Sequence, residues 1–244
     1  MASPRIFCDV RLGPGAQFAL AEDAANHLAK SLRLSAGDSL VVFDGRGGEY
    51  EALILRIDRG RVEVKTGAFR DADREPPFET GLVQGLPEAD KMDWILQKSV
   101  ELGAAWVQPV VCDRSVVRLS GDRAARRESH WQRVMVAACE QCGRNRVPAL
   151  KPTLAFRDWA AQASPGHRWM LSPGAAEALV AQPPPDGPVQ LLVGPEGGLS
   201  ERELDIALTI GFKPLSLGPR VLRAETAPLA ALATLQALWG DFRG

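Results

Sequence analysis

The chain has 244 residues, of which 45% are hydrophobic and 24% charged, and its formal net charge at pH 7 is -1. This composition is typical of a folded globular protein and excludes a disordered or fibrous one. Because the chain contains neither an apolar run of the roughly 20 residues that span a bilayer nor an apolar signal core near its start, we expect a cytoplasmic protein.

The first seventy or so residues are rich in short segments of β-branched or alternating residues. Turn signals separate these segments, among them Gly37-Asp38 and the glycine-rich stretch 44–48. The pattern predicts a small closed sheet or barrel that is interrupted by one helix. The expected strands cover residues 5–9, 39–43, 49–57 and 62–66, and the expected helix covers 22–32.

Residues 67–80 are polar and contain Pro76-Pro77, which is the composition of a linker. We therefore place a domain boundary there, between a first domain of residues 1–72 and a second domain of residues 73–244.

Beyond the linker, strand-like and helix-like segments alternate, which predicts an α/β domain with a mainly parallel sheet. The segment Ser200-Glu-Arg-Glu203 has the form of a capping box and marks the start of one helix. The expected strands cover residues 80–86, 106–112, 168–171, 189–193 and 213–217, and the expected helices cover 89–102, 129–142, 200–210 and 226–239.

The four cysteines do not have the spacing of a metal site. Cys139 and Cys142 form a C-x-x-C pair late in a helical stretch, whereas Cys8 and Cys112 are distant and isolated. A zinc site needs two further ligands at matched spacing. We expect reduced structural cysteines and no metal, with a metal or redox role as the alternative.

The stretch from residue 114 to residue 146 is locally basic, with eight arginines against three acidic residues. One interpretation is a solvated helix face. The other is contact with nucleic-acid phosphate, for which arginine is better suited than lysine. The arginines are Arg114, Arg118, Arg123, Arg126, Arg127, Arg133, Arg144 and Arg146.

Two glycine- and proline-containing loops follow strands that we expect to be adjacent. They cover residues 193–198 and 217–227, and ligands of parallel sheets bind at this carboxyl edge. Glycine allows a ligand to approach the backbone closely, and proline stiffens the loop. The pair predicts a pocket for a flat polar group such as adenine, whereas the motifs of dinucleotide and P-loop sites are absent.

Five ordered blocks of the sequence resemble the RsmE family of the SPOUT superfamily, bacterial methyltransferases that act on N3 of one uridine in 16S ribosomal RNA. The blocks are Pro4-Arg-Ile-Phe7; His27-Leu28 with Leu32-Arg33 and Gly37-Asp38; Lys91-Met-Asp-Trp94 with Lys98 and Glu101-Leu-Gly103; Glu140-Gln141 with Arg144 and Val147-Pro148; and the two Gly-Pro loops. The family more often has serine at position 142 and often threonine at position 224, where this chain has Cys142 and Ala224.

The resemblance implies a trefoil-knotted SPOUT-type methyltransferase domain preceded by a small PUA-like β-barrel that binds RNA. It also implies S-adenosylmethionine as the cofactor, the 30S ribosomal subunit or its 16S RNA as the substrate, and a homodimer. Independently, the helix expected at 226–239 has apolar residues on most of its faces, more than one domain surface can cover. Those residues are Leu229, Leu232, Leu235, Leu238 and Trp239.

The chemistry requires removal of a weakly acidic proton and stabilisation of the resulting anion. Arg144 is assigned to the uracil anion, Gln141 to the edge of the base, and Glu140 or Glu225 to accepting the proton or orienting arginines. The residues expected to line the cofactor site are Leu171, Gly194, Glu196, Gly197, Gly198, Leu217, Gly218, Leu222, Arg223, Thr226 and Ala227, and those expected to contact RNA are Arg5, Arg11, Arg33, Lys91, Arg114 and Arg146.

Three alternatives remain open at this stage. A related methyltransferase could act on another base or on a ribose 2′-oxygen, because its cofactor loops would be similar. A non-catalytic RNA-binding assembly factor would not need two complete cofactor loops. A nucleotide-dependent metabolic enzyme is disfavoured by the missing phosphate motifs.

Overall fold

A computed structural model describes residues 3–117, 121–162 and 165–243, so that Arg118 of the basic stretch lies outside the described residues. The chain divides into two compact units. The first unit comprises Met1–Glu75 together with Cys139–Val147, and the second comprises Pro76–Ala138 together with Pro148–Gly244.

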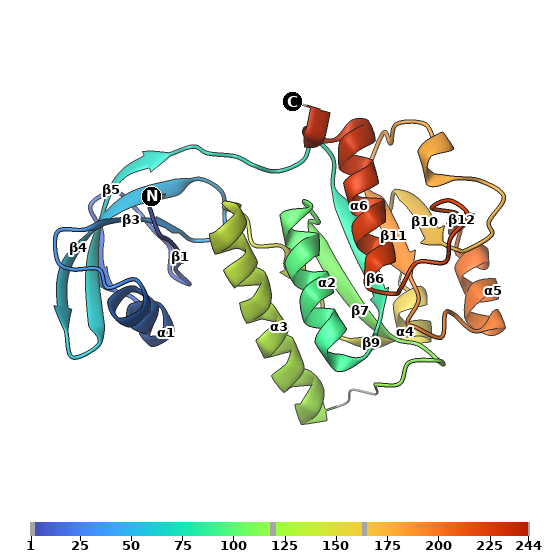
Figure 1. The fold of residues 1–244 in the computed structure, drawn as a ribbon, viewed down its shortest axis with the longest axis horizontal. Coiled ribbons are helices and arrows are strands. Elements are labelled where there is room, and N and C mark those ends of the chain that lie inside the picture. Colours follow the sequence, from blue (N-terminus) through green and yellow to red (C-terminus); the bar gives the residue numbers. More distant parts are fainter. Residues whose placement is uncertain (1–2, 118–120, 163–164, 244) are drawn as a thin grey trace. The chain divides into compact units, whose positions relative to one another are not determined.

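The first unit is built on a five-stranded sheet of order β1-β3-β4-β5-β2 (Figure 1). β1 runs parallel to β3, and the other neighbours are antiparallel. One face of the sheet packs on a core that includes Leu28, Val42, Ile54 and Val64. The elements are β1 (Arg5–Phe7), β2 (Gln17–Ala19), α1 (Glu22–Asn26) with the π-helical turn His27–Ser31, β3 (Ser39–Phe43), β4 (Glu49–Asp58) and β5 (Arg61–Arg70).

The sheet extends into the segment that the sequence predicted as linker. β5 continues to Arg70, and the Phe69 ring packs on Tyr50 with their centroids 5.1 Å apart. The linker prediction was therefore wrong for residues 67–70, because cross-strand pairing with β4 outweighs their polar and glycine-containing composition. β2 was not predicted.

The second unit is built on a parallel sheet of order β12-β10-β11-β6-β7-β8, with β9 paired to β7. This confirms the predicted α/β domain. Every residue of β6 and β11 is buried, as expected for central strands covered on both faces. The strands are β6 (Thr80–Gly85), β7 (Trp106–Val111), β8 (Ala149–Leu150), β9 (Leu154–Ala155), β10 (His167–Leu171), β11 (Val189–Val193) and β12 (Lys213–Leu215).

Four helices of the second unit pack as two pairs, and Figure 1 shows one pair, α2 and α6, side by side in front of the sheet. α4 and α5 contact each other over a core that includes Val83, Trp159, Leu192 and Phe212. Ser200 caps α5 through the predicted capping box. The helices are α2 (Ala89–Glu101), α3 (Gly121–Cys142), α4 (Phe156–Ala160), α5 (Glu201–Thr209) and α6 (Thr226–Trp239), with 3-10 turns at Leu179–Ala181 and Asp241–Arg243.

Two details of the second unit correct the predictions. α3 begins at Gly121, eight residues before the predicted start at residue 129, because its largely exposed first turns lack the apolar period on which that prediction relied. β11 and β12 are not adjacent: β10 lies between them, since the parallel connection from β11 crosses over β10 before it joins the sheet.

Candidate active site

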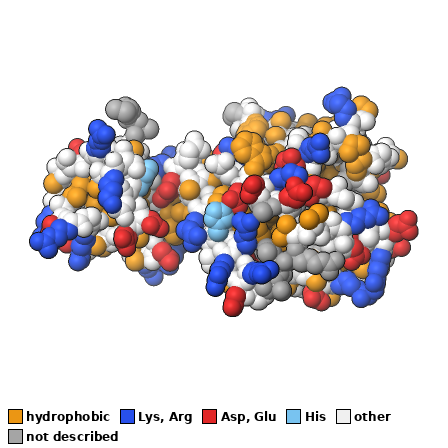
Figure 2. Space-filling model, turned by 60° about the horizontal axis from the view of Figure 1, so that its bottom comes forward, with side chains coloured by type: hydrophobic (Ala, Val, Ile, Leu, Met, Phe, Trp, Pro, Cys, Tyr) orange, Lys and Arg blue, Asp and Glu red, His pale blue; other side chains and the backbone are white. Residues whose placement is uncertain are grey.

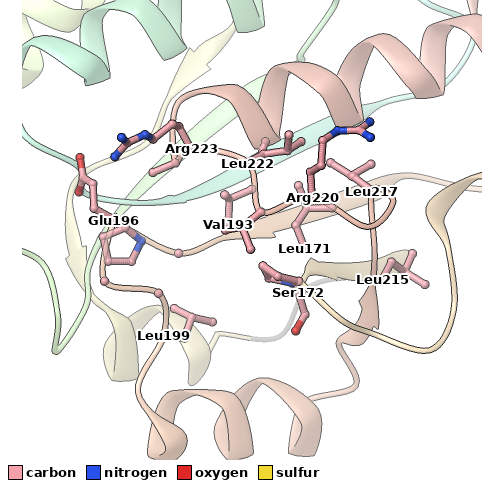
Figure 3. A pocket seen from close by; sticks show the side chains of 18 of the residues that line it. Leu171, Ser172, Val193, Glu196, Leu199, Leu215, Leu217, Arg220, Leu222 and Arg223 are labelled. Atoms are coloured by element: carbon pink, nitrogen blue, oxygen red, sulfur yellow. The ribbon is translucent and has the colours of Figure 1, made fainter.

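The carboxyl ends of β10, β11 and β12 surround a cavity of about 600 Å³. The loop after β11 and the loop after β12 flank the end of β10, so the strand between them adds Ser172 and Pro173 to the cavity wall. Figure 3 shows the apolar side chains of Leu171, Val193 and Leu217 at the end of these strands. The cavity therefore combines an apolar floor with exposed loop backbone.

Ten of the eleven residues predicted to hold a cofactor line this one cavity, and Thr226 does not. The sequence missed residues that lie beside the predicted ones, although the rule that ligands bind at strand carboxyl ends could have found Ser172 and Pro173. The additional lining residues are Ser172, Pro173, Val193, Pro195, Leu199, Leu204, Leu215, Arg220, Val221 and Ala224.

Glycines shape both loops, each for a different reason. Gly198 and Gly218 have φ angles of 68° and 89°, which L side chains rarely adopt. A Cβ at Gly194 would lie 3.1 Å from the backbone of Gly198, so the turn closes tightly on itself. A Cβ at Gly197 would lie 3.0 Å from the Cβ of Arg114. A side chain there would press on the 113–115 loop rather than fill the cavity.

The loop after β11 is held from behind by the end of β6. A Cβ on Gly85 would lie 2.6 Å from Cδ of Pro195, so the glycine allows the two segments to touch. Nε2 of the buried Gln84 donates to the Gly85 carbonyl at 2.9 Å and also lies 3.5 Å from the Gly194 carbonyl. Gly85 and Gln84 were not predicted, because their role depends on a contact between distant parts of the sequence.

Glu196 fixes the same loop to the start of α2. Its carboxylate accepts hydrogen bonds from the Glu88 backbone N–H at 3.1 Å and from Lys91 Nζ at 2.8 Å. Burial alone would raise the pKa of Glu196, but the hydrogen bonds from Lys91 and from backbone N–H groups, with the positive charge of Lys91, together lower it. Arg114 Nη1 donates to the Gly197 carbonyl at 3.1 Å. Lys91 and Arg114, both predicted to contact RNA, are thus engaged with the cavity loop.

Three charged side chains line the cavity. In Figure 3 the side chains of Arg223 and Glu196 lie on the same side, whereas Arg220 lies apart from them. Glu225 follows two lining residues and stands at the N-cap of α6. Its Oε2 atom is buried and has no hydrogen-bond partner among the described residues. A buried carboxylate oxygen without a partner is uncommon in folded proteins and marks Glu225 as a candidate for a functional role.

The first unit contains a buried polar cluster centred on Glu49, whose side chain is 1% exposed. Arg5, Arg70 and Arg74 form ion pairs with it. Arg5 also donates to the Gly143 carbonyl at 3.1 Å and to Oδ1 of Asn145. Burial would raise the pKa of Glu49, but the hydrogen bonds from Arg5 and Arg70 lower it to about 2. Arg5 was predicted to bind phosphate, and here protein groups occupy its guanidinium.

The predicted catalytic residues of α3 and its C-terminal end also belong to the first unit. Arg144 is 4% exposed and donates to both carboxylate oxygens of Glu75. Glu140 accepts the Phe7 backbone N–H at 2.9 Å, and burial raises its pKa. Gln141 is exposed. The fourth candidate, Glu225, belongs to the second unit with the cavity.

The remaining predicted RNA contacts are exposed arginines of the first unit. Arg11 and Arg33 lie at its surface, and Arg146 Nη1 donates to the Arg46 carbonyl at 3.0 Å. On the face that Figure 2 shows, basic side chains are interspersed with acidic ones rather than gathered in one patch. On this face, charge alone therefore does not mark an RNA surface.

The four cysteines are all free thiols. Cys8, Cys112 and Cys139 are buried free thiols and Cys142 is half-buried; burial raises the pKa of Cys8 and of Cys139 to about 12. The described part of the chain contains no cluster of three or more histidine, cysteine or acidic side chains suited to a metal. None of its helices combines the length and hydrophobicity needed to cross a bilayer.

Comparison with known proteins defines the class to which this fold and cavity belong. A family model described as an RNA methyltransferase domain matches residues 74–236, and one described as an RNA methyltransferase PUA domain matches residues 20–66. The first match spans the parallel sheet and both loops of the cavity. The class is therefore that of RNA methyltransferases with an N-terminal PUA-like domain.

Relatives narrow this class to one family. The chain is 30% identical to ribosomal RNA small subunit methyltransferase E of Buchnera aphidicola subsp. Schizaphis graminum, over 98% of this chain and 97% of the relative. The Neisseria gonorrhoeae protein of that name, solved bound to S-adenosyl methionine, is 37% identical, with a TM-score of 0.91 over 98% of this chain and 99% of that one. A Legionella pneumophila protein solved with bound SAM is 34% identical, with a TM-score of 0.95 over 99% and 100%. The chain belongs to the ribosomal RNA small subunit methyltransferase E family.

Proposed function

We propose that this chain is an S-adenosylmethionine-dependent methyltransferase that modifies N3 of one uridine in 16S ribosomal RNA, in the 30S subunit. The observation that carries the proposal is the single cavity formed by both Gly-Pro loops, since the loops lie about 20 residues apart in the sequence yet meet at one sheet edge. The small-subunit RNA substrate is taken from the names of the relatives.

The cavity fits S-adenosylmethionine by its size and its donor set. A volume of about 600 Å³ lies in the range of sites that enclose a drug-sized ligand. Leucines offer an apolar slot for adenine, and the backbone at Gly198 and Gly218 is open, since a Cβ at either position would meet nothing within 4 Å. Arg223 is suited to the carboxylate of the ligand. The bound cofactor supplies an electrophilic methyl group.

The residues of this chain must deprotonate the uracil and hold the resulting anion. Glu225 is supported as proton acceptor by its partnerless Oε2 beside the cavity, and Glu140 by its raised pKa. Arg144 is proposed to stabilise the anion, because Glu75 holds its guanidinium in one orientation and so reduces reorganisation. Gln141, exposed at the end of α3, is proposed to read the edge of the base.

Several further properties complete the proposal. The domains are residues 1–72, which bind RNA, and residues 73–244, which carry a C-terminal trefoil knot. Arg11, Arg33 and Arg146 are the proposed phosphate contacts, and the enzyme acts in the cytoplasm.

A homodimer is supported by α6, on which Leu229, Leu238 and Trp239 remain partly exposed in the single chain. Light scattering should then give about twice the chain mass of 26.3 kDa, and the chain mass alone would contradict the dimer.

The decisive experiment combines binding with mapping of the product. Titration calorimetry should show one S-adenosylmethionine per chain, and 30S subunits from a strain lacking the gene should then accept one methyl group. A methyl on N3 stops reverse transcriptase, whereas a ribose 2′-methyl leaves the pairing edge intact. Absence of S-adenosylmethionine binding would favour a non-catalytic assembly factor, and a 2′-methyl product would favour a related methyltransferase that acts on ribose.

A further inference from the structure

The first unit contains a second recess, of about 670 Å³, beside the turn that joins β4 to β5. Three of its lining side chains are basic and one, Glu22, is acidic. None of them was among the residues predicted to contact RNA. The lining residues are Ala19, Leu20, Glu22, Asn26, Lys30, Arg59, Gly60 and Arg61.

The turn beside the recess has an unfavourable residue at its first position. Asp58 pairs with Arg61 across the ladder, which leaves Arg59 and Gly60 as a two-residue loop. Their φ angles are 45° and 84°. Two positive φ angles define a type I′ turn, in which asparagine followed by glycine is strongly preferred. Arginine in the left-handed region is strained, and such strain persists chiefly where the side chain has a function.

The basic side chains of the recess are available to a ligand. Lys30 and Arg59 are exposed, and within the described ranges neither takes part in an ion pair. Arg61 lies 3.5 Å from Glu63, but its side chain is 68% exposed, so that this pair is weak. The Asn26 side chain adds a neutral hydrogen-bonding group, and Leu20 closes the floor.

We propose that Lys30, Arg59 and Arg61 bind the phosphate backbone of the RNA substrate. The inference rests on the proposed function, which supplies an RNA. The cations come from two elements, the helical segment and the hairpin turn, and line one recess. Residues 20–66, which match the PUA domain of RNA methyltransferases, include both elements. Phosphate contacts of this kind give affinity and position rather than sequence selection.

The test exploits the opposite effects that one substitution should have on stability and on binding. Arg59→Asn restores the preferred turn residue and should raise the melting temperature by about 2–4 °C. It should weaken binding of 30S subunits from a strain lacking the gene by about three- to tenfold and reduce the salt slope by about one. A residue with only a structural role would not give a more stable protein that binds RNA less well.

Arg56→Gln is the matched control, because Arg56 is 62% exposed on β4, carries the same charge and does not line the recess. It should leave RNA affinity close to that of the parent, and both variants should bind S-adenosylmethionine normally. Equal RNA affinity of parent and Arg59→Asn, or an equal loss in Arg56→Gln, would overturn the proposal while leaving the methyltransferase intact. If the parent itself neither bound nor methylated the RNA, the proposed function would fail as well.

Discussion

Replacement of Gly85 by alanine should weaken cofactor binding, although Gly85 does not line the cavity. The new Cβ would lie 2.6 Å from Cδ and 2.7 Å from the backbone nitrogen of Pro195. Ordinary contact begins at 3.4 Å, so Pro195 must recede by about 0.8 Å. Because Pro195 lines the cavity and β6 lies behind it, the loop is displaced towards the cofactor.

The size of the effect follows from the cost of overpacking. Forcing a methyl group into a packed site costs about 1–3 kcal/mol. The free protein can relieve this strain by moving the loop, whereas the bound cofactor requires the original loop position. The strain should therefore appear as a loss of binding free energy. The dissociation constant for S-adenosylmethionine should therefore rise by about 5- to 150-fold. Gly194→Ala, whose Cβ meets backbone at 3.1 Å, should have a smaller effect in the same direction.

Titration calorimetry on the folded variants measures this series. Gly187→Ala is the control, because a Cβ there meets nothing within 4 Å and its φ is not positive. Circular dichroism checks that each variant retains its secondary structure. The reasoning would be refuted if Gly85→Ala bound the cofactor as tightly as the parent, or if Gly187→Ala were equally impaired.

Three further predictions concern charged residues. Glu49→Gln should lower the unfolding free energy at pH 7 by roughly 2–3 kcal/mol. Because the pKa of Glu49 is depressed in the folded state, the parent should lose this contribution as the pH falls from about 4.5 towards 2. A difference between parent and variant in urea unfolding that did not change with pH would contradict this. Lys91→Met should weaken S-adenosylmethionine binding several-fold and leave the salt dependence of RNA binding unchanged, since Lys91 holds Glu196. Normal cofactor binding with a reduced salt dependence of RNA binding would instead show that Lys91 contacts RNA. Arg144→Ala should slow single-turnover methyl transfer at least about a hundredfold and leave cofactor affinity normal. Glu75→Gln, which removes the charge that pairs with Arg144, should slow the transfer less. An unchanged rate in Arg144→Ala would show that this residue has only a structural role.

Much of the second unit could be predicted because its elements are strongly patterned. The central strand β11 is apolar except for Gln190 and was predicted with its observed bounds, as was the helix Thr226–Trp239. Short elements such as β2, β8 and α4 carry too few residues to show a period. Their structure depends on partners elsewhere in the chain, for example the Trp159 ring of α4, which packs on Phe212.

The cavity was largely predictable and the surroundings of the catalytic candidates were not. Glycine and proline mark the two loops directly in the sequence, so ten lining residues followed. The ion pairs of Arg5 with Glu49 and of Arg144 with Glu75 join residues 44 and 69 positions apart. Periodicity cannot show such pairs. Arginines that the sequence predicted as free cations are therefore found partly or fully buried and paired with carboxylates.

The pairing of β6 with β11 has a consequence for synthesis of the protein on the ribosome. Thr80 begins the first strand of the parallel sheet, yet its partner on one side is Val189, more than a hundred residues later. The centre of the sheet cannot close until β11 has left the exit tunnel, and long-range pairing of this kind folds slowly. The nascent domain must therefore remain open, with apolar strands exposed, for most of its translation. Its cofactor cavity, which needs residues up to Ala227, forms only when the chain is almost complete.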